Sequence, residues 1–294
     1  MQREESLAEK LRQYTASGIY PMHMPGHKRN VPICIKDLLC DIYSIDVTEV
    51  EGTDNLHQAE GIILQAMQYA AKVYGAKDTF FLVNGSSGGI LSAMHCCHRK
   101  KKKVLMTPGA HISAYHGLEL FGLEPIFVDT EYFEDIGIAA GLNPEKVMEK
   151  IREQGDEFAF VYITSPTYEG VILQVREIAD IAHAHHIPLI VDEAHGAHLH
   201  FLKQEQNFSA LDYGADLVIQ SVHKTLPSLT QTAILHIQGE MISRDEIERS
   251  LTFFETSSPS YILMSAIDAA IRYMDEVGEK KLAQLWEWQQ EFRA

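Results

Sequence analysis

The chain has 294 residues, 46% of them hydrophobic, and its 41 acidic against 25 basic side chains give a formal net charge of −16. That size and apolar content suffice for a substantial core, whereas the acid excess disfavours nucleic acid as a partner, because phosphate backbones reward dense lysine and arginine. With no apolar run of about 18 residues, no apolar signal core at the amino terminus and only four cysteines, we expect a cytoplasmic protein without a membrane partner.

From residue 58 onward, apolar runs alternate with amphipathic stretches, whereas residues 1–57 are irregular and rich in proline, glycine and histidine. This alternation predicts an α/β fold in which a mainly parallel sheet has helices on both faces. A last helical stretch is expected around residues 265–277. The predicted helices are 58–74, 88–98, 113–121, 144–154 and 175–186, and the predicted strands are 79–83, 104–106, 125–128, 158–164, 187–192 and 215–219.

The first predicted strand runs into the sequence Asn-Gly-Ser-Ser-Gly-Gly at 84–89 and then into a helix. Such a turn brings unpaired backbone N–H groups and the positive end of the helix dipole to one point, which suits an anion such as phosphate. The run matches neither Gly-x-Gly-x-x-Gly nor Gly-Lys-Ser/Thr, which argues against dinucleotide and nucleoside triphosphate ligands. The alternative is a plain helix N-terminus capped by a serine.

The apolar run at 187–191 ends in Asp192. A parallel strand would deliver this carboxylate at the carboxyl edge of the sheet, where the ligands of open α/β sheets gather. A pyridine nitrogen stays protonated only beside an anion, so Asp192 has the chemistry that pyridoxal phosphate requires. A helix N-cap or an acid in a surface turn is the alternative.

The strand-like run at 215–219 is followed by Ser-Val-His-Lys-Thr at 221–225. Low dielectric at the end of a buried strand disfavours the charged form of Lys224 and frees its lone pair to attack a carbonyl. The natural carbonyl partner is pyridoxal phosphate. A solvated lysine on an ordinary loop is the alternative, and the phosphate-sized turn and the strand-end aspartate argue against it.

Six short sequences stand in a fixed order along the chain: Pro-Gly-His-Lys at 25–28, Asp-Asn-Leu-His at 54–57, Ser-Pro-Thr-Tyr at 165–168, Asp-Glu-Ala-His-Gly-Ala-His at 192–198, Ser-Val-His-Lys-Thr at 221–225 and Leu-Thr-Gln at 229–231. Together they resemble the ornithine/lysine/arginine decarboxylase family of fold-type-I pyridoxal phosphate enzymes. The resemblance runs from about residue 20 to about residue 270.

The resemblance implies that Lys224 holds pyridoxal phosphate as a Schiff base and that Asp192 pairs with the pyridine nitrogen. It also implies that His111 stacks on the cofactor ring and that Ala194 touches the opposite face. Their alternatives are a loop histidine satisfied by its neighbours and simple packing. The side chains that would bind the phosphate come from two loops and are Ser86, Ser87, Ser221 and His223.

The implied reaction is the decarboxylation of a basic amino acid, lysine, arginine or ornithine, to the corresponding amine and CO2. The substrate amine displaces Lys224, the bond from Cα to the carboxylate is held at right angles to the conjugated system, and Cα is then reprotonated. The proton donor is Lys224 or a nearby histidine such as His223. The protein supplies orientation and electrostatics.

Two departures from the family pattern stand out. Relatives usually carry Arg-Asn-x-His-Lys-Ser where this chain has Thr-Pro-Gly-Ala-His-Ile-Ser at 107–113, so two cationic side chains are missing near the cofactor. Relatives also continue into a smaller C-terminal domain, and we expect only its beginning here. The expected organisation is an N-terminal segment at 1–57, a cofactor-binding large domain at 58–255 and the start of a truncated C-terminal region at 256–294.

The family further implies a homodimer or higher homo-oligomer, in which the N-terminal segment packs across the interface that completes the site. The short chain keeps open an alternative, a truncated module that binds pyridoxal phosphate or associates with a partner without catalysis. A metal enzyme is the other rival, because histidines cluster near Asp192 and near residue 185. That rival is weak, since a His-x-His pair on a helix points in two directions. The possible ligand sets are His195, His198 and His200 with Asp192, or His183, His185 and His186, or Cys96, Cys97 and His98.

Overall fold

The computed structural model describes residues 13, 16–38, 42–98, 101–155, 157–202 and 208–294. Part of the predicted N-terminal segment, including Cys40, lies outside the described residues. The helices are α2 (Ile33–Leu38), α3 (Ile62–Tyr74), α4 (Gly85–His98), α5 (Ile112–Phe121), α6 (Pro144–Gln154), α7 (Val175–Ala184), α8 (Val222–Thr225), α9 (Arg244–Phe254) and α10 (Tyr261–Arg293), with 3-10 turns η1 (Leu56–Gln58), η2 (Leu199–Phe201) and η3 (Ala210–Tyr213). The strands are β1 (Asp78–Leu82), β2 (Lys103–Met106), β3 (Glu124–Phe127), β4 (Glu131–Phe133), β5 (Ile138–Gly141), β6 (Phe158–Thr164), β7 (Leu189–Asp192), β8 (Leu217–Gln220) and β9 (Ala233–Ile237).

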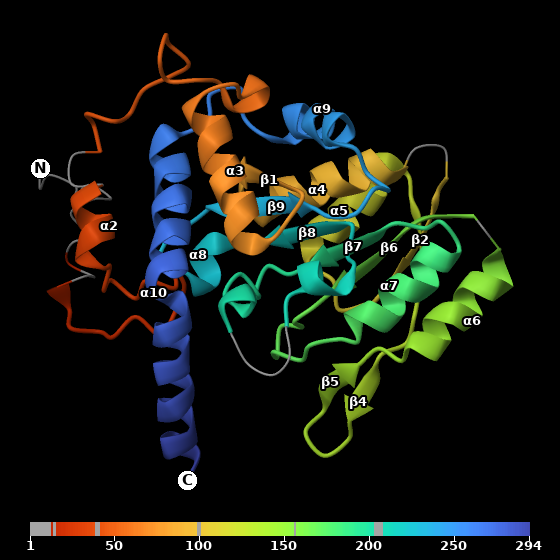
Figure 1. The fold of residues 1–294 in the computed structure, drawn as a ribbon. Coiled ribbons are helices and arrows are strands. Elements are labelled where there is room, and N and C mark those ends of the chain that lie inside the picture. Colours follow the sequence, from red (N-terminus) through yellow and green to blue (C-terminus); the bar gives the residue numbers. More distant parts are fainter. Residues whose placement is uncertain (1–12, 14–15, 39–41, 99–100, 156, 203–207) are drawn as a thin grey trace, which may run out of the picture.

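A seven-stranded sheet in the order β1-β9-β8-β7-β6-β2-β3 forms the centre of the molecule (Figure 1). Strand β9 is antiparallel to both of its neighbours, and the other paired strands of this sheet run parallel. The predicted mainly parallel sheet is therefore confirmed. Parallel strands end at a common edge, so the residues that follow β6, β7 and β8 are brought together there.

Helices cover both faces of the sheet, as predicted. Helices α4 and α5 lie on one face with α9 against α4, while α6 and α7 lie together on the other face (Figure 1). The central strands β7, β8 and β9 are buried at every position, which is expected of strands sandwiched between two helical layers. These strands and the helices around them share one continuous hydrophobic core.

Two predicted helices begin later or end earlier than the periodicity suggested. The helix expected from residue 58 begins at Ile62, because Asp54 accepts hydrogen bonds from the N–H groups of Gly61 at 2.8 Å and Ile63 at 2.9 Å and so fixes the start of α3. The helix expected to reach residue 186 ends at Ala184. Its extension was wrong because His186 has a positive φ of 55°, which ends a right-handed helix.

The helix expected to begin at residue 88 begins three residues earlier, at Gly85, so both serines of the glycine-rich sequence lie in its first turn. Gly85 has a φ of 73°, a conformation that glycine adopts readily and that lets the chain pass from β1 into α4 without a longer loop. The two serines are thus helical residues at a helix N-terminus.

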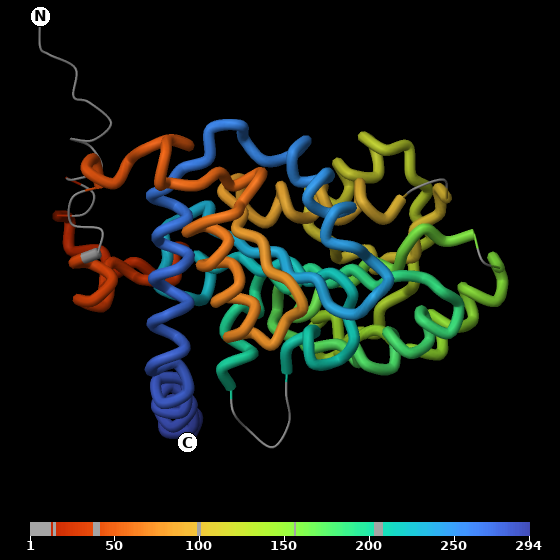
Figure 2. The backbone as a smooth tube through the Cα atoms, turned by 45° about the horizontal axis from the view of Figure 1, so that its top comes forward, coloured from red at the N-terminus to blue at the C-terminus, as the bar shows by residue number. Residues whose placement is uncertain are grey.

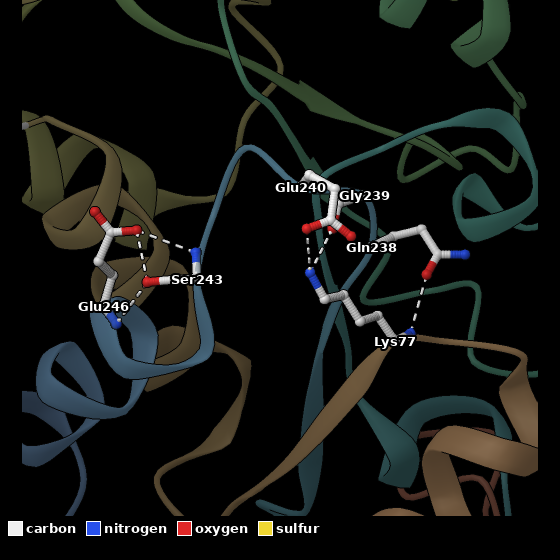
Figure 3. Close-up of polar contacts among 6 residues, drawn as sticks. All are labelled: Lys77, Gln238, Gly239, Glu240, Ser243 and Glu246. Carbon is white, nitrogen blue, oxygen red and sulfur yellow. Dashed lines mark hydrogen bonds and ion pairs between the residues drawn. The ribbon is translucent and has the colours of Figure 1, made fainter.

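Several elements were not predicted from the sequence: the hairpin β4-β5, strand β9, and helices α2, α8 and α9. The start of α9 is fixed by a capping box, in which Ser243 N–H donates to Glu246 Oε2 at 3.0 Å and Glu246 N–H donates to Ser243 Oγ at 3.3 Å (Figure 3). On the neighbouring loop Lys77 pairs with Glu240 at 2.9 Å. The far end of α9 lies beside the glycine turn that begins α4.

Helix α10 extends well beyond the predicted stretch at 265–277 and covers 33 residues. Its first half contacts α2 and α3 and contributes Ile267, Ala270 and Ile271 to the core, while its second half projects from the body (Figures 1 and 2). The division at residues 57/58 and 255/256 stays a prediction. None of the described helices is long and apolar enough to cross a bilayer.

Candidate active site at the carboxyl edge of the sheet

The carboxyl ends of three adjacent parallel strands bring the predicted site residues together. Thr164 at the end of β6 is in register with Asp192 at the end of β7, and Asp192 is in register with Ile219 of β8. Lys224 lies on the one-turn helix α8 directly after β8. Residues that are 32 and 28 positions apart in the chain therefore share one edge, which is the edge expected from the strand pattern.

Asp192 is a buried carboxylate that accepts hydrogen bonds from two protein groups. Its Oδ2 accepts from the Tyr162 hydroxyl at 3.2 Å and its Oδ1 accepts from the Ala194 N–H at 3.1 Å. Burial raises the pKa of Asp192, and the Ala194 N–H, the charge of Lys224 and the Tyr162 hydroxyl oppose that rise. A cationic group placed beside this carboxylate would favour its ionised form.

The amine of Lys224 interacts electrostatically with the carboxylate of Asp192. Burial lowers the pKa of Lys224, and the negative charge of Asp192 opposes the shift. A larger neutral fraction of the amine makes it a better nucleophile at neutral pH. The alternative of a solvated loop lysine is not what the structure shows, because Lys224 is partly buried.

The Pro-Gly-His-Lys sequence at 25–28 covers the backbone of Lys224. The N–H of Gly26 donates to the His223 carbonyl oxygen at 2.8 Å, and a Cβ added at Gly26 would lie 2.7 Å from the Lys224 carbonyl oxygen. Only glycine permits this approach without displacing one of the two loops. This contact gives the early motif a physical role, which is to hold the turn that carries the lysine.

Four hydroxyl or imidazole groups lie around the start of α4 and α8. Ser221 is buried at the N-cap of α8, and its hydroxyl donates to the Ser86 hydroxyl at 2.9 Å. Ser87 follows Ser86 in the first turn of α4. His223 has its Nδ1 2.8 Å from the Thr232 carbonyl oxygen, and burial lowers the pKa of its imidazole. A helix N-terminus with converging hydroxyl groups can bind an anion.

His111 caps helix α5. Its Nδ1 accepts from the Ser113 N–H at 3.2 Å and lies 2.7 Å from the Ser113 hydroxyl, and the residue as a whole is exposed. Its charge still acts on the site, because it lowers the pKa of both Asp192 and His195. Ala194, two residues after Asp192, is buried. Stacking of His111 on one face of the cofactor ring and contact of Ala194 with the opposite face remain predictions.

His195 was considered only as a metal ligand in the sequence, yet it lies within the site. Burial lowers the pKa of its imidazole, and the charges of Lys224 and His111 lower it further. Its ring meets the ring of Tyr168 edge to face, with the centroids 5.8 Å apart. The signal in the sequence was its position three residues after the strand-end aspartate, on the loop that lines this edge.

Two further hydroxyl groups at this edge were missed. Thr164 Oγ1 and Thr225 Oγ1 are buried and have no hydrogen-bond partner among the described residues. Thr164 pairs in register with Asp192, and Thr225 follows Lys224. Buried hydroxyl groups rarely lack a partner, so both can serve a ligand bound between the strand ends.

In the structure, the histidines of the metal hypothesis make other contacts. His183 Nε2 bonds Asp216 at 2.8 Å, and the ring of His200 lies 5.3 Å from that of Tyr74. Burial lowers the pKa of His198 to about 4. Across the described ranges no group of three or more histidine, cysteine, aspartate or glutamate side chains is arranged to hold a metal ion.

Glu193 turns away from the site into a buried polar network. It accepts hydrogen bonds from the Ala210 N–H at 2.7 Å, the Ser209 hydroxyl at 3.0 Å and Gln220 Nε2 at 2.6 Å. Gln220 Oε1 in turn lies 3.3 Å from His236 Nε2. Burial raises the pKa of Glu193 to about 8, so this acid is largely protonated at neutral pH.

The Glu193→Gln variant is expected to reduce the pH dependence of folding stability. Because the pKa of Glu193 is higher in the folded protein, the folded state binds the proton more tightly, and the free energy of unfolding falls as pH rises from the ordinary glutamate value towards 8. The contribution of this residue is about 1 kcal/mol per pH unit. Urea unfolding of both proteins between about pH 5 and 8 measures it. Parallel stability curves would contradict a protonated Glu193.

Comparison with known proteins places this geometry in context. A family model described as Orn/Lys/Arg decarboxylase, major domain, matches residues 6–294. An arginine decarboxylase of Bacillus subtilis (strain 168) is 33% identical over 282 residues, which cover 95% of this chain and 57% of that relative. The chain therefore spans less than two thirds of the length of this relative.

Solved structures show the same fold. The constitutive lysine decarboxylase of E. coli superposes with a TM-score of 0.76 and 22% identity, over 97% of this chain and 43% of that one. A lysine-to-alanine variant of a serine palmitoyltransferase from S. paucimobilis, with a bound PLP-myriocin aldimine, superposes with a TM-score of 0.65 and 15% identity, over 87% of this chain and 62% of that one. The predicted fold class, that of the fold-type-I pyridoxal phosphate enzymes, is confirmed.

Proposed function

This chain belongs to the Orn/Lys/Arg decarboxylase family, and from that premise we propose that it binds pyridoxal 5'-phosphate and decarboxylates a basic amino acid to the corresponding amine and CO2. One observation carries the proposal: a partly buried lysine with a lowered pKa faces the field of a buried strand-end aspartate at the ligand-binding edge of the sheet. Relatives named arginine decarboxylase, 31% to 33% identical, make arginine the first substrate to test.

The residues present fit the cofactor group by group. Lys224 offers an amine for covalent attachment, and Asp192 offers an anion for the pyridine nitrogen. The first turn of α4 and the hydroxyl groups beside it offer donors for a phosphate. The buried hydroxyl groups of Thr164 and Thr225, which lack partners among the described residues, offer further polar contacts. The side chains that we assign to the phosphate are Ser86, Ser87, Ser221 and His223.

Pyridoxal phosphate, when bound, supplies an electron sink for the electron pair that remains on Cα when CO2 leaves. The protein has to keep the ring nitrogen protonated, because only in that state does the cofactor accept these electrons well. Asp192 does so as an anion that holds a proton on the ring nitrogen, and its hydrogen bonds from Tyr162 and Ala194 fix the direction of its carboxylate. We therefore assign to Asp192 an electrostatic role and not a proton-transfer role.

Lys224 has two tasks in the proposed reaction. Its neutral amine is the nucleophile for the cofactor carbonyl, and burial favours this neutral form. The same amine, when it does not hold the cofactor, would be placed to deliver a proton to Cα of the substrate. His223 is the other candidate donor, because it is adjacent in the chain and its lowered pKa makes the imidazolium a stronger acid.

We propose that three side chains orient the substrate and the ring. We assign the two ring faces to His111 and Ala194, as the family resemblance implies. His195, with Tyr168 against it, adds a second imidazole near Lys224 and His111. The Gly26 contact holds the lysine turn from the other side. We further propose a cytoplasmic homodimer or higher homo-oligomer.

Release of labelled CO2 from carboxyl-labelled arginine, lysine and ornithine tests the proposed activity. With pyridoxal phosphate added, we expect release from at least one of the three, with arginine preferred. Cofactor binding without CO2 release from any of them would contradict the decarboxylase assignment and support the alternative, a module that binds the cofactor or a partner without catalysis.

A further inference from the structure

Glu255 joins the end of α9 to the glycine turn that begins α4, although 171 residues separate it from Asn84. Its Oε2 accepts from the N–H groups of Val83 at 2.9 Å and Asn84 at 3.0 Å. A third hydrogen bond connects the same two segments, because Asn84 Nδ2 donates to the Phe254 carbonyl oxygen at 2.9 Å. Glu255 itself is the C-cap of α9. The turn is thereby held from outside the sheet at two consecutive residues.

The other oxygen of the same carboxyl group lies against the first turn of α4. Glu255 is 6% exposed, and its Oε1 is buried without a hydrogen-bond partner among the described residues. A Cβ added at Gly88 would lie 2.6 Å from this oxygen. A buried polar atom that touches a helix N-terminus and lacks a partner is placed to respond to an anion bound there.

The charge of this carboxyl group changes near neutral pH. Burial raises the pKa of Glu255 to about 7, and the two N–H groups from Val83 and Asn84 oppose the rise. The ionisable side chains that share its small cavity are His57 from η1 and Glu248 from α9. Glu248 is paired with Arg244 at 2.7 Å, and His57 Nε2 lies 2.8 Å from the Thr256 carbonyl oxygen.

We propose that Glu255 is a positioning residue of the cofactor phosphate site: it fixes the turn between β1 and α4, and its ionisation weakens the hold of that turn on a phosphate dianion. The inference rests on the proposed binding of pyridoxal phosphate. Protonated, the carboxyl group keeps the turn in place without adding charge. Ionised, it sets a negative charge beside the first turn of α4, where it repels the phosphate.

The experiment compares pyridoxal phosphate with pyridoxal, which lacks the phosphate but can attach to the same lysine. For each protein, the dissociation constant for pyridoxal divided by that for pyridoxal phosphate measures what the phosphate contributes. In the wild type we expect this quotient to fall about tenfold, relative to Glu255→Gln, between about pH 6 and 8.5. Dividing the two dissociation constants removes the effect of Lys224 ionisation, which is common to both compounds. Comparing the quotient of the wild type with that of Glu255→Gln removes the effects of the neighbouring groups and of the phosphate, which both proteins share.

The Glu255→Gln variant keeps an acceptor for the two N–H groups and removes only the charge, so it is expected to fold. Glu240→Gln is the matched control, since Glu240 is exposed and pairs with Lys77 at the opposite edge of the sheet (Figure 3). This control is expected to follow the wild type at every pH. Glu255→Ala, which removes the acceptor, is expected to lower the quotient at low and high pH alike.

Two outcomes overturn the inference and can be told apart. A quotient that varies with pH identically in the wild type and Glu255→Gln would show that Glu255 does not act on the phosphate, while leaving the proposed function intact. A wild type that takes up neither compound at any pH would contradict the proposed function, and the role of Glu255 would fall with it.

Discussion

Replacing Lys224 with alanine is expected to abolish covalent capture of pyridoxal phosphate and to lower CO2 release by about 10³-fold or more. The amine of Lys224 is the nucleophile in the account, and burial lowers its pKa although the charge of Asp192 opposes the shift. Lys150, by contrast, lies on α6 and is paired with Glu153 at the surface, so it is not expected to replace an amine at the carboxyl edge of the sheet.

A titration with pyridoxal phosphate followed by visible absorbance measures the capture, and labelled CO2 measures the reaction. The matched control is Lys150→Ala, which removes an exposed lysine that forms an ion pair with Glu153 at 3.0 Å. We expect this control to behave as the wild type does. Equal capture and equal turnover in Lys224→Ala would remove the lysine from the mechanism.

Replacing Asp192 with asparagine is expected to lower CO2 release by about 10²- to 10³-fold while Lys224 still captures the cofactor. Asparagine preserves the shape of the side chain but cannot hold a proton on the pyridine nitrogen, so the electron sink is weakened. The fold should tolerate the change, because burial already raises the pKa of Asp192 and asparagine carries no charge to bury.

The neighbouring carboxyl group offers the matched control. Glu193 is as deeply buried as Asp192, but it bonds Ser209, Ala210 and Gln220 behind the site. We expect Glu193→Gln to retain CO2 release at neutral pH, where Glu193 is largely protonated. If the two variants lost activity to the same extent, a specific role for Asp192 at the ring nitrogen would be untenable.

The parts of the fold that the sequence predicted are those governed by local pattern. Strand β6 at Phe158–Thr164 and helix α6 at Pro144–Gln154 match the predicted limits, because a continuous apolar run marks one and an Asn143 cap with a following proline marks the other. The chemistry of Asp192 and Lys224 could be predicted for the same reason, since Asp192 ends one buried strand and Lys224 lies on the turn that follows the next one.

Long-range contacts could not be predicted in this way. Strand β9 inserts between β1 and β8 as an antiparallel strand, and nothing in its own residues specifies those two neighbours. Glu255 lies in no motif, and only the folded chain brings its carboxyl group to the N–H groups of Val83 and Asn84. In the sequence His195 appeared only among the ligands of the rival metal hypothesis, because its position relative to Lys224 depends on the order of the strands.

The Gly26 contact illustrates how a motif acquires a physical meaning from the fold. From the sequence, Pro-Gly-His-Lys at 25–28 was only a point of resemblance. In the structure its glycine lies against the lysine turn, where a side chain would meet the Lys224 carbonyl oxygen. The N-terminal segment therefore reaches the site through backbone contact, which residue types alone do not indicate.

The central claim is that Lys224 is the point at which this chain holds its cofactor. Incubation with pyridoxal phosphate, reduction with borohydride, proteolysis and mass spectrometry locate the attachment directly. The account predicts about one pyridoxyl group per chain, on the peptide that contains Lys224. Labelling spread over exposed lysines such as Lys77 and Lys150, with Lys224 unmodified, would contradict it.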